Sequence, residues 1–362
     1  MPTTTTRLRD LGVAIGTLPV GASNSLTDVA GVRVGHRTLV RGDDVRTGVT
    51  AIWPHDGNPL SERVYAGIHL LNGYGEMTSR SVIDEWGLLC SPIVLTGTSG
   101  VGTALHATTR YLANRYPEQA RDEVPIALVA ECDDGFLHDH LTFALSEEDV
   151  WAALDGATTG PVEEGCVGSG TGMALFQFKG GIGSASRVVA TGAGTFTVGV
   201  LVMTNFGRRP RLTVAGVPVG RALTDLMPEN PTPEGSCIVV VATDAPLHAH
   251  TLRRVAQRAG LGLARTGSIG GDGSGEIIVA FSTAQRIPYR MPSGLLHVAL
   301  VPEGSYDSAA LNLVFEATVD ATEEAVLNAL LAATTTRGRR GRVLHAAPHD
   351  QLRALLEAHA AH

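Results

Sequence analysis

Short apolar runs separated by glycine-rich turns dominate the pattern of this chain. Residues 126–130, 197–203 and 276–281 lack the alternation of polar and apolar positions that marks a strand with one wet face. Continuous runs of this length indicate strands that are buried on both faces. A fourth run, residues 237–242, directly follows Ser236. We therefore expect sheets that are covered on both sides.

Helical periodicity lies between these runs. It predicts a helix over residues 101–116 and a second over residues 251–259, which Gly260 would close as the residue after the C-cap. Residues 320–323 resemble a capping box that opens a third helix, and residues 352–356 belong to a last amphipathic one. No shift in composition marks a domain boundary. The pattern predicts a layered α/β fold in a single domain, residues 1–362.

Composition and charge narrow the function. The chain has 362 residues, of which 44% are hydrophobic and 43 are glycine, so a substantial core with many tight turns is expected. The formal net charge of -8 argues against a nucleic-acid partner, because phosphate binding needs a concentrated positive field. The one basic run, residues 337–342, is expected to be a solvated loop between helices.

The sequence also bears on location. Residues 1–10 lack the apolar core of a signal peptide, and no run of about 18 apolar residues is present that would span a bilayer. Four cysteines without CxxC spacing suit a reducing compartment. We expect a cytoplasmic protein without a membrane partner.

Two glycine-rich segments, residues 168–172 and 270–275, superficially resemble phosphate-binding loops. Neither has the GxxxxGK[ST] or the full GxGxxG spacing, so both are expected to form turns. A Ser-His-Asp triad lacks its GxSxG elbow, since the nearest string, residues 97–100, opens the helix at residue 101. These segments give no sign of a nucleotide cofactor.

The thirteen histidines raise the question of a metal site. His138 and His140 flank Asp139, and His248 lies near His250. Side chains two positions apart diverge on a helix, and neither pair has a matching second cluster. We expect no metal and no cofactor.

The junction between Gly235 and Ser236 is the strongest candidate for chemistry. Pro231 and Pro233 hold the approach extended and exposed, and Gly235 can adopt backbone angles that other residues avoid. Cleavage before Ser236 would give one residue both a hydroxyl nucleophile and an α-amine, whose pKa of about 7.7–8.0 lets it act as a base near neutral pH. Taken alone, the dipeptide favours a turn before a core strand, because Gly-Ser pairs are common in turns.

Ordered blocks along nearly the whole chain resemble the DmpA/BapA family of self-cleaving aminopeptidases. The blocks are residues 27–36, 46–50, 72–76, 179–187, 236–247 and 273–276. The resemblance implies a precursor that cleaves itself into a large chain, 1–235, and a small chain, 236–362. It also implies a four-layer α-β-β-α sandwich like that of N-terminal nucleophile hydrolases, with connectivity of the DmpA and ornithine acetyltransferase type. A homo-oligomer of cleaved pairs, acting on a small peptide or an amino-acid amide, is implied as well.

The resemblance assigns roles to individual residues. Ser236 would be the nucleophile and, through its freed amine, the base. Asn205, at the end of an apolar run, matches the family's oxyanion-hole asparagine, and Ser274 and Glu276 match the residues that flank the new N-terminus. Read without the family, these last three would pass as turn residues.

Substrate recognition is more open. Glu131 follows the run 126–130, where a charge is costly unless it is paired, and either a substrate ammonium or a structural salt bridge could pair it. Some relatives carry a tyrosine nearby that assists the oxyanion, whereas this segment has Asp133 and Phe136. Cys237 is expected to pack in the core and not to compete as a nucleophile.

Three interpretations follow. The first is a self-processing N-terminal-serine aminopeptidase that releases an α-, β- or D-amino residue. The second is another amide hydrolase or acyltransferase on the same scaffold, similar to nylon-oligomer hydrolase or ornithine acetyltransferase. The third is a glycine-rich binding or assembly protein whose bond between Gly235 and Ser236 stays intact.

Overall fold

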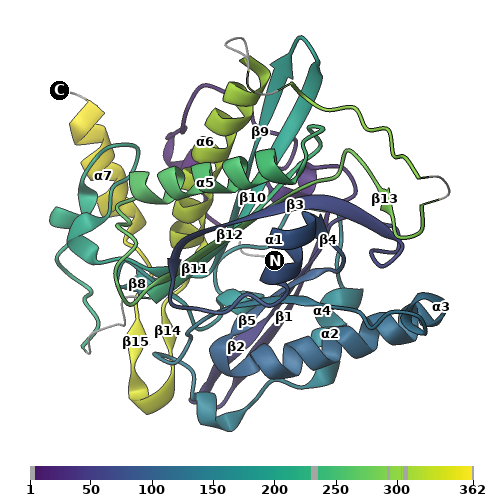
Figure 1. Cartoon of the computed structure of the whole chain (residues 1–362). Coiled ribbons are helices and arrows are strands. Elements are labelled where there is room, and N and C mark those ends of the chain that lie inside the picture. The colour runs from purple at the N-terminus through teal and green to yellow at the C-terminus, as the bar shows by residue number, and fades with distance from the viewer. Residues whose placement is uncertain (1–4, 230–234, 292–293, 303, 305–308, 361–362) are drawn as a thin grey trace.

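Helices and sheets stack in four layers, α-β-β-α, in the computed structural model (Figure 1). The structure describes residues 5–229, 235–291, 294–302, 304 and 309–360. Pro231 and Pro233 of the expected loop lie outside these residues. Helices α5 and α6 cover one sheet, the second sheet packs against its other face, and helices α2 and α4 cover that second sheet. The predicted sandwich is confirmed.

Within the described residues, the larger sheet has seven strands and the smaller has four. The larger sheet runs in the order β13, β3, β12, β11, β10, β9, with β4 paired to β3. Its strands are β3 (Glu62–Gly73), β4 (Leu88–Leu89), β9 (Ile182–Thr191), β10 (Gly194–Phe206), β11 (Gly235–Thr243), β12 (Gly275–Ser282) and β13 (Ile287–Pro288). The smaller sheet comprises β1 (Arg33–Arg41), β2 (Val45–Trp53), β5 (Ile93–Gly97) and β6 (Leu128–Cys132). Two neighbouring pairs, β11 with β12 and β5 with β6, are parallel.

The helices lie on the outer faces and at the edges. They are α1 (Arg80–Trp86), α2 (Val101–Arg115), α3 (Pro117–Ala120), α4 (Glu147–Asp155), α5 (Ala249–Arg265), α6 (Ala309–Ala332) and α7 (His349–Ala360). Two short hairpins pair β7 (Ala174–Leu175) with β8 (Phe178–Lys179) and β14 (Thr336–Arg337) with β15 (Val343–Leu344). The basic run of residues 337–342 lies in the second hairpin. This hairpin connects α6 to α7, and a connection between helices was predicted for these residues.

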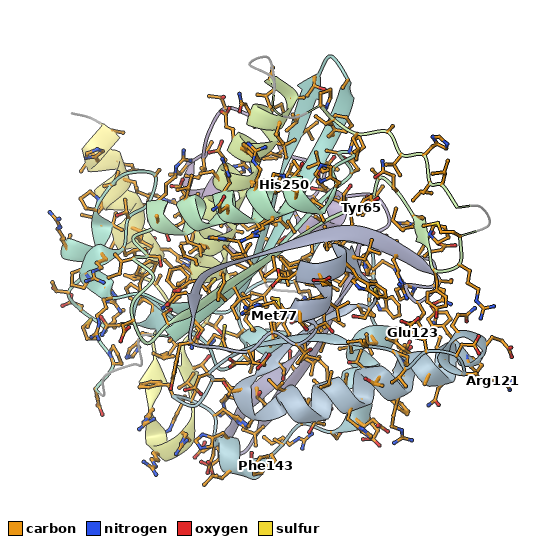
Figure 2. The ribbon with its side chains drawn as sticks, viewed as in Figure 1. Tyr65, Met77, Arg121, Glu123, Phe143 and His250 are labelled. Carbon is orange, nitrogen blue, oxygen red and sulfur yellow. The ribbon has the colours of Figure 1, made fainter. Side chains whose placement is uncertain are left out.

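The layered packing explains the continuous apolar runs. Every residue of β11 and of β12 is buried, because one face of each strand packs under α5 and α6 and the other packs on the smaller sheet. Met77 lies in the inter-sheet core, forms a bridge to Ala130 and occupies the middle of the molecule in Figure 2. Strands that are buried on both faces do not alternate between polar and apolar residues.

Two predicted helix boundaries are wrong. Helix α5 continues through Gly260 to Arg265, because its glycines let it pack closely: a β-carbon at Gly262 would lie 2.6 Å from the Val319 carbonyl oxygen of α6. The expected capping box at residues 320–323 lies inside α6, whose first helical residue is Ala309. Asp320 is buried there and accepts a 2.7 Å hydrogen bond from Arg265 of α5. The ion pair with α5 therefore explains why acidic residues are buried inside α6.

None of the helices in the described ranges is both long enough and apolar enough to cross a lipid bilayer. The longest of them, α6, carries buried polar side chains along its length, including Glu324 and Asn328. These polar groups bind the N-terminal segment: Asn328 accepts a hydrogen bond from the Leu8 amide, and Glu324 pairs with Arg9. Residues before β1 are thereby fastened to the C-terminal third of the chain.

Candidate active site

Ser236 is the second residue of β11, at the edge where the strand begins. It is 7% exposed and lies directly opposite Asn205 of β10 on one side and Gly275 of β12 on the other. Two of the predicted partners are therefore within one residue of Ser236 in the sheet register, because Ser274 and Glu276 flank Gly275. The sheet brings together residues from positions 205, 236 and 274–276.

Gly235 occupies a position that only glycine fits. Its φ of +86° lies in the left-handed region, which other residues adopt at a cost. A β-carbon there would lie 1.6 Å from the Asn205 carbonyl oxygen. The residue before Ser236 is thus constrained both by its backbone angle and by its close approach to β10.

The Asn205 side chain is held at both ends. Its Oδ1 accepts a hydrogen bond from the Ala174 amide at 2.9 Å, and its Nδ2 donates to the Asp133 carbonyl at 2.8 Å. The residue is 4% exposed. A primary amide carries two N–H donors, so one remains for another acceptor. Asn205 is thus a fixed donor opposite Ser236, as an oxyanion hole requires.

Ser274 and Glu276 are hydrogen-bonded to each other. The Ser274 hydroxyl donates to Oε1 of Glu276, as expected for alternate residues that point the same way, although Ser274 lies just before the strand. Oε2 of Glu276 is buried and has no hydrogen-bond partner among the described residues. Burial raises the pKa of this carboxyl, and the Ser274 bond opposes that shift. The carboxyl is 1% exposed and lacks a cation.

Strand alternation divides the site between the two faces of the larger sheet. Ile238 packs between the sheets, whereas its neighbour Cys237 packs under α5 and α6. Successive strand residues point to opposite faces, so the Ser236 hydroxyl and Asn205 face the inter-sheet side. Glu276, which pairs with Cys237 in the register, lies on the helix-covered face beside a narrow cleft. The backbone nitrogen of Ser236 lies in the plane of the larger sheet, between its two faces.

Cys237 behaves as predicted. It is fully buried, and burial raises the pKa of its thiol well above the usual value, with the nearby Glu276 carboxyl acting in the same direction. A thiol whose pKa is raised carries little nucleophilic thiolate near neutral pH.

Glu131 lies within β6 of the smaller sheet, at the end of the sandwich that holds Ser236. It is 5% exposed, and burial raises the pKa of its carboxyl. Its Oε2 accepts a hydrogen bond from Thr98 and its Oε1 accepts from the Glu76 amide at 3.0 Å. It forms no salt bridge with any residue in the described ranges, so they contain no partner for the structural ion pair that was one of the two alternatives. Among the described residues, only neutral donors stabilise the buried carboxylate.

Gly75 connects Glu131 to the serine. A β-carbon at Gly75 would lie 3.2 Å from Oε1 of Glu131 and 3.8 Å from the Gly275 α-carbon, and Gly275 is the strand partner of Ser236. The Glu131 carboxyl is therefore separated from β12 by little more than a glycine backbone. The two sheets bring the carboxyl and the hydroxyl to the same end of the sandwich.

Asp133 and Phe136 lie in the segment where the family resemblance suggested a tyrosine donor. Asp133 is exposed, its carboxylate accepts a hydrogen bond from the Gly135 amide at 2.8 Å, and its carbonyl orients Asn205. Phe136 is buried, 5% exposed, and has no polar group. Asp133 therefore supports the site through its backbone and not through a hydroxyl donor.

Two residues of this site were missed in the sequence. Thr98 lies in the string of residues 97–100 that had been set aside as a helix start, yet its hydroxyl binds Glu131. Asp134 is fully buried beside Asp133, and burial raises the pKa of its carboxyl to about 7. Gly97 leaves space for it, since a β-carbon there would lie 2.2 Å from Asp134 Oδ2. Asp134 lies shortly after the apolar run 126–130, and Thr98 directly follows β5, a strand that was not predicted from the sequence.

The remaining candidates have structural roles. His138 is buried and accepts a hydrogen bond from the Arg46 amide at 3.3 Å, and the glycine-rich segment 168–172 packs against β2. No cluster of three or more His, Cys, Asp or Glu side chains with the geometry of a metal site occurs in the part of the chain that the structure describes.

Comparisons with known proteins bear on the family and the fold. The family model of peptidase family S58 matches residues 24–344. The β-peptidyl aminopeptidase BapA of Sphingosinicella xenopeptidilytica is 42% identical, over 97% of this chain and 91% of its own. The L-aminopeptidase D-Ala-esterase/amidase of Ochrobactrum anthropi, described as a variant of the Ntn hydrolase fold, superposes with a TM-score of 0.91 at 42% identity, covering 98% of this chain and 99% of that one. A β-aminopeptidase of Burkholderia sp. gives 0.89 at 41% identity with the same coverage.

These findings confirm the resemblance drawn from the sequence, the Ntn-type fold and the enzyme class, a serine-type aminopeptidase. The match extends over nearly the entire chain and includes every candidate residue of the site, from Glu131 to Glu276. The chain belongs to peptidase family S58.

Proposed function

We propose that this protein is a self-processing aminopeptidase in which Ser236 is the nucleophile, first of its own cleavage and then of amide hydrolysis. The observation that carries the proposal is the position of Ser236 between a fixed amide donor, Asn205, and a buried carboxyl, Glu276, that lacks a cation. In this proposal residues 1–362 form one domain that is cut into 1–235 and 236–362.

Self-cleavage would proceed by an acyl shift. The Ser236 hydroxyl oxygen attacks the Gly235 carbonyl carbon, the bond to the Ser236 nitrogen breaks, and that nitrogen takes up the hydroxyl proton. Water then hydrolyses the resulting ester and leaves a carboxylate on Gly235 and a free α-amine on Ser236. The absence of a side chain at Gly235 supports this step, because it allows the left-handed backbone and the close approach to β10, and it leaves the carbonyl carbon open to the serine hydroxyl.

The mature site would use the same groups. The α-amine accepts the Ser236 proton as the oxygen attacks the substrate carbonyl, Asn205 donates to the developing oxyanion, and an acyl-enzyme forms while the amine product leaves with a proton. Ser274 and Glu276 would hold the amine. An ammonium beside Glu276 would lower the pKa that burial now raises.

Glu131 would bind the free amino end of the substrate. Its carboxylate is buried, accepts only neutral donors and faces the serine end of the sandwich. The names of the relatives suggest an N-terminal β-amino residue, or a D-alanyl amide or ester, as the group released. A small peptide or amino-acid amide is therefore the proposed substrate.

The proposal extends to assembly and location. We expect a homo-oligomer of cleaved pairs, as in the family resemblance, which light scattering on the purified protein would test. The four free cysteines, of which Cys132 and Cys237 are fully buried, support a reducing compartment such as the cytoplasm.

Denaturing gels of wild type, Ser236→Ala and Cys237→Ala test the central claim. Wild type and Cys237→Ala should give fragments of about 25 and about 13 kDa, in proportion to the two parts of the 37.8 kDa chain, and the small fragment should begin at residue 236. Ser236→Ala should remain whole. A folded wild type that stays in one piece, or cleavage that needs Cys237, would refute the proposal.

Kinetics with matched anilides then test the substrate. Aminoacyl- and β-aminoacyl-anilides should be hydrolysed, and Glu131→Gln should raise their KM. An N-acyl-anilide has no ammonium, so its hydrolysis should be insensitive to that change. Preference of the wild type for the acyl-anilide would favour the general amide hydrolase or acyltransferase interpretation.

A further inference from the structure

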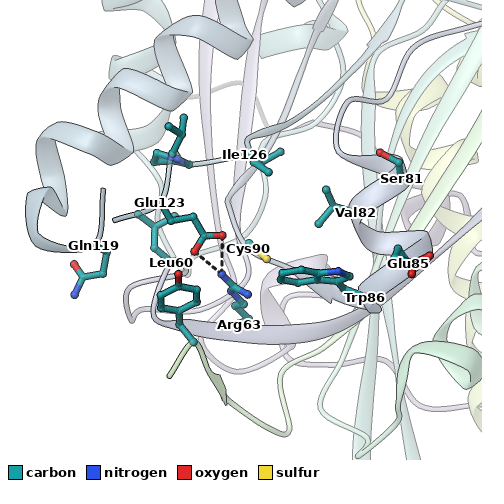
Figure 3. A pocket seen from close by; sticks show the side chains of 13 residues that line it. Leu60, Arg63, Ser81, Val82, Glu85, Trp86, Cys90, Gln119, Glu123 and Ile126 are labelled. Atoms are coloured by element: carbon teal, nitrogen blue, oxygen red, sulfur yellow. Dashed lines mark hydrogen bonds and ion pairs between the residues drawn. The ribbon is translucent and has the colours of Figure 1, made fainter. Parts of the chain in front are cut away.

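A second cavity, of about 440 Å³, lies far from the candidate active site. It is bounded by α1 on one side and by residues 119–126 on the other, with β3 as its floor (Figure 3). Its apolar lining comprises Leu60, Val82, Trp86, Val124, Pro125 and Ile126. A volume of this size suits a small organic ligand.

Exposed apolar side chains gather at this cavity. Trp86 is 58% exposed, Val124 71% and Ile126 49%, although residues of these types are usually buried. In Figure 3 the Trp86 indole and the Ile126 side chain border the same opening from opposite elements. The cavity therefore offers an apolar, partly aromatic surface for the body of a ligand.

Arg63 and Glu123 form an ion pair at the floor of the cavity. Nη2 of Arg63 donates to both carboxylate oxygens of Glu123, at 3.0 and 3.1 Å, and the Arg63 side chain is 6% exposed. Its guanidinium lies 5.6 Å from the Trp86 ring centre and 4.6 Å from that of Tyr289. The positive charge of Arg63 is thus paired with Glu123 and held between two rings, while its buried Nε has no hydrogen-bond partner among the described residues.

The unmatched charge at the cavity is a single carboxylate. Glu85, at the rim beside Trp86, forms no ion pair with any residue that the structure describes, and it is exposed. An adjoining cavity of about 550 Å³ shares Gln119 and Tyr289 with the first. Its charged lining consists of Glu62, Glu118, Asp122 and Arg290. Asp122 pairs with Arg290, Glu118 with Arg121 and Glu62 with Arg286, so Glu85 is the one lining carboxylate without an ion-pair partner among the described residues.

The cavity is separate from the candidate active site. Arg63 lies at the start of β3, opposite Ile287, whereas the other end of β3, at Gly73, pairs with Gly275 beside Ser236. Ten residues of strand separate the two ends, or about 30 Å at 3.3 Å per residue. Figure 2 shows Glu123 at the periphery, toward Arg121, and away from the central Met77. A ligand in the cavity would not touch Ser236.

We propose that this cavity is a binding site for a hydrophobic amine. The apolar body packs between Trp86 and Ile126, and the ammonium lies beside Glu85 at the rim. Charge decides between an amine and a carboxylic acid of the same shape, because the unpaired Glu85 carboxylate attracts a cation and repels an anion. The proposal is independent of the proposed function of Ser236.

Calorimetric titration with two probes of similar shape, phenethylamine and 3-phenylpropionate, tests the proposal on the intact purified protein. Phenethylamine should bind about tenfold more tightly than 3-phenylpropionate, as expected from one added attraction and one added repulsion at a half-exposed site. Glu85→Gln should remove most of that difference, and Trp86→Ala should abolish binding. Trp86→Phe, which keeps a ring, should retain it, and Glu357→Gln on the remote helix α7 is the matched control.

Glu131→Gln identifies binding at the candidate active site instead. Phenethylamine binding that is lost in Glu131→Gln but kept in Glu85→Gln and Trp86→Ala would overturn the proposal. Equal affinity for the two probes, or no binding of the amine to a wild type that melts cooperatively, would overturn it as well. Retained binding in Glu131→Gln together with loss in Glu85→Gln and Trp86→Ala would support it, whatever the catalytic role of Ser236 proves to be.

Discussion

Replacing Gly235 by alanine should both destabilise the fold and slow the cleavage that we propose before Ser236. The alanine β-carbon would be forced to within 1.6 Å of the Asn205 carbonyl oxygen while the backbone keeps a φ of +86°. Either β10 and β11 separate at this point, or the backbone rotates out of the left-handed region. Both responses move the scissile carbonyl relative to the serine hydroxyl.

The magnitude follows from two contributions. A left-handed conformation costs a residue with a side chain about 1–2 kcal/mol, and overpacking against backbone costs about 1–3 kcal/mol. Gly235→Ala should therefore lower the free energy of unfolding by about 2–5 kcal/mol. With an unfolding entropy of about 2.1 cal/mol/K per residue, a chain of 362 residues loses about 3–7 °C in Tm.

Gly216→Ala is the matched control. Gly216 has a φ of +84°, but a β-carbon there would meet nothing within 4 Å. Only the conformational cost applies, so its Tm should fall by about 1–3 °C. Both substitutions should be measured by calorimetry in a Ser236→Ala background, where the chain is expected to stay whole, and the cleavage rate should be followed on gels with Ser236 present. Equal Tm values for the two variants, or cleavage of Gly235→Ala at the wild-type rate, would refute the reasoning.

Three further substitutions test the site and its support. Asn205→Ala should reduce kcat of the mature enzyme about 10²–10³-fold with little change in KM, and unchanged kcat would exclude an oxyanion role. Asp134 has a pKa raised to about 7 by burial, so the folded state binds its proton more tightly, and wild-type stability should fall as pH rises from about 4 to about 7. In urea unfolding, the free energy of unfolding of Asp134→Asn should rise relative to that of wild type as the pH increases across that window, by on the order of 4 kcal/mol. A difference that does not change with pH would contradict the raised pKa. Glu324→Gln leaves Arg187, its fully buried partner at 2.6 Å, without a counter-charge and should cost about 3–5 kcal/mol of unfolding free energy, against less than about 1 kcal/mol for the exposed control Arg110→Ala. A loss no larger than that of the control would show that the buried pair does not stabilise the fold.

Much of the fold could be predicted because burial on both faces leaves a simple mark on a strand. The run after Ser236 is apolar at every position, and helix α2 shows the period expected of a helix on one sheet. The start of helix α6 was predicted wrongly because its buried acidic residues resemble the capping box of a helix start. Asp320 is stabilised by Arg265, a residue 55 positions away, and no local pattern reports such a partner.

The sequence supplied the candidate residues of the site but not the groups that hold them in place. Ser236, Asn205 and Glu276 were reached through the family resemblance, and the sheet register brings them together. The Thr98 hydroxyl and the Asp133 carbonyl, which hold Glu131 and Asn205, are ordinary groups whose importance depends on which strands are neighbours. Only the packing of the smaller sheet against the larger one selects them.

The electrostatics of the site tie the two proposed reactions together. Glu131 and Glu276 are both buried, have pKa values raised by burial, and form no ion pair with any described residue. The proposed reactions introduce two ammonium groups at this end of the sandwich, one on Ser236 after cleavage and one on the substrate. Glu276 lies on the helix-covered face, next to the strand position where the new amine forms, and Glu131 faces the sheet from the opposite side. Each carboxyl therefore has one cation within reach, so the desolvation cost that both bear in the uncleaved chain would be offset first by processing and then by substrate binding.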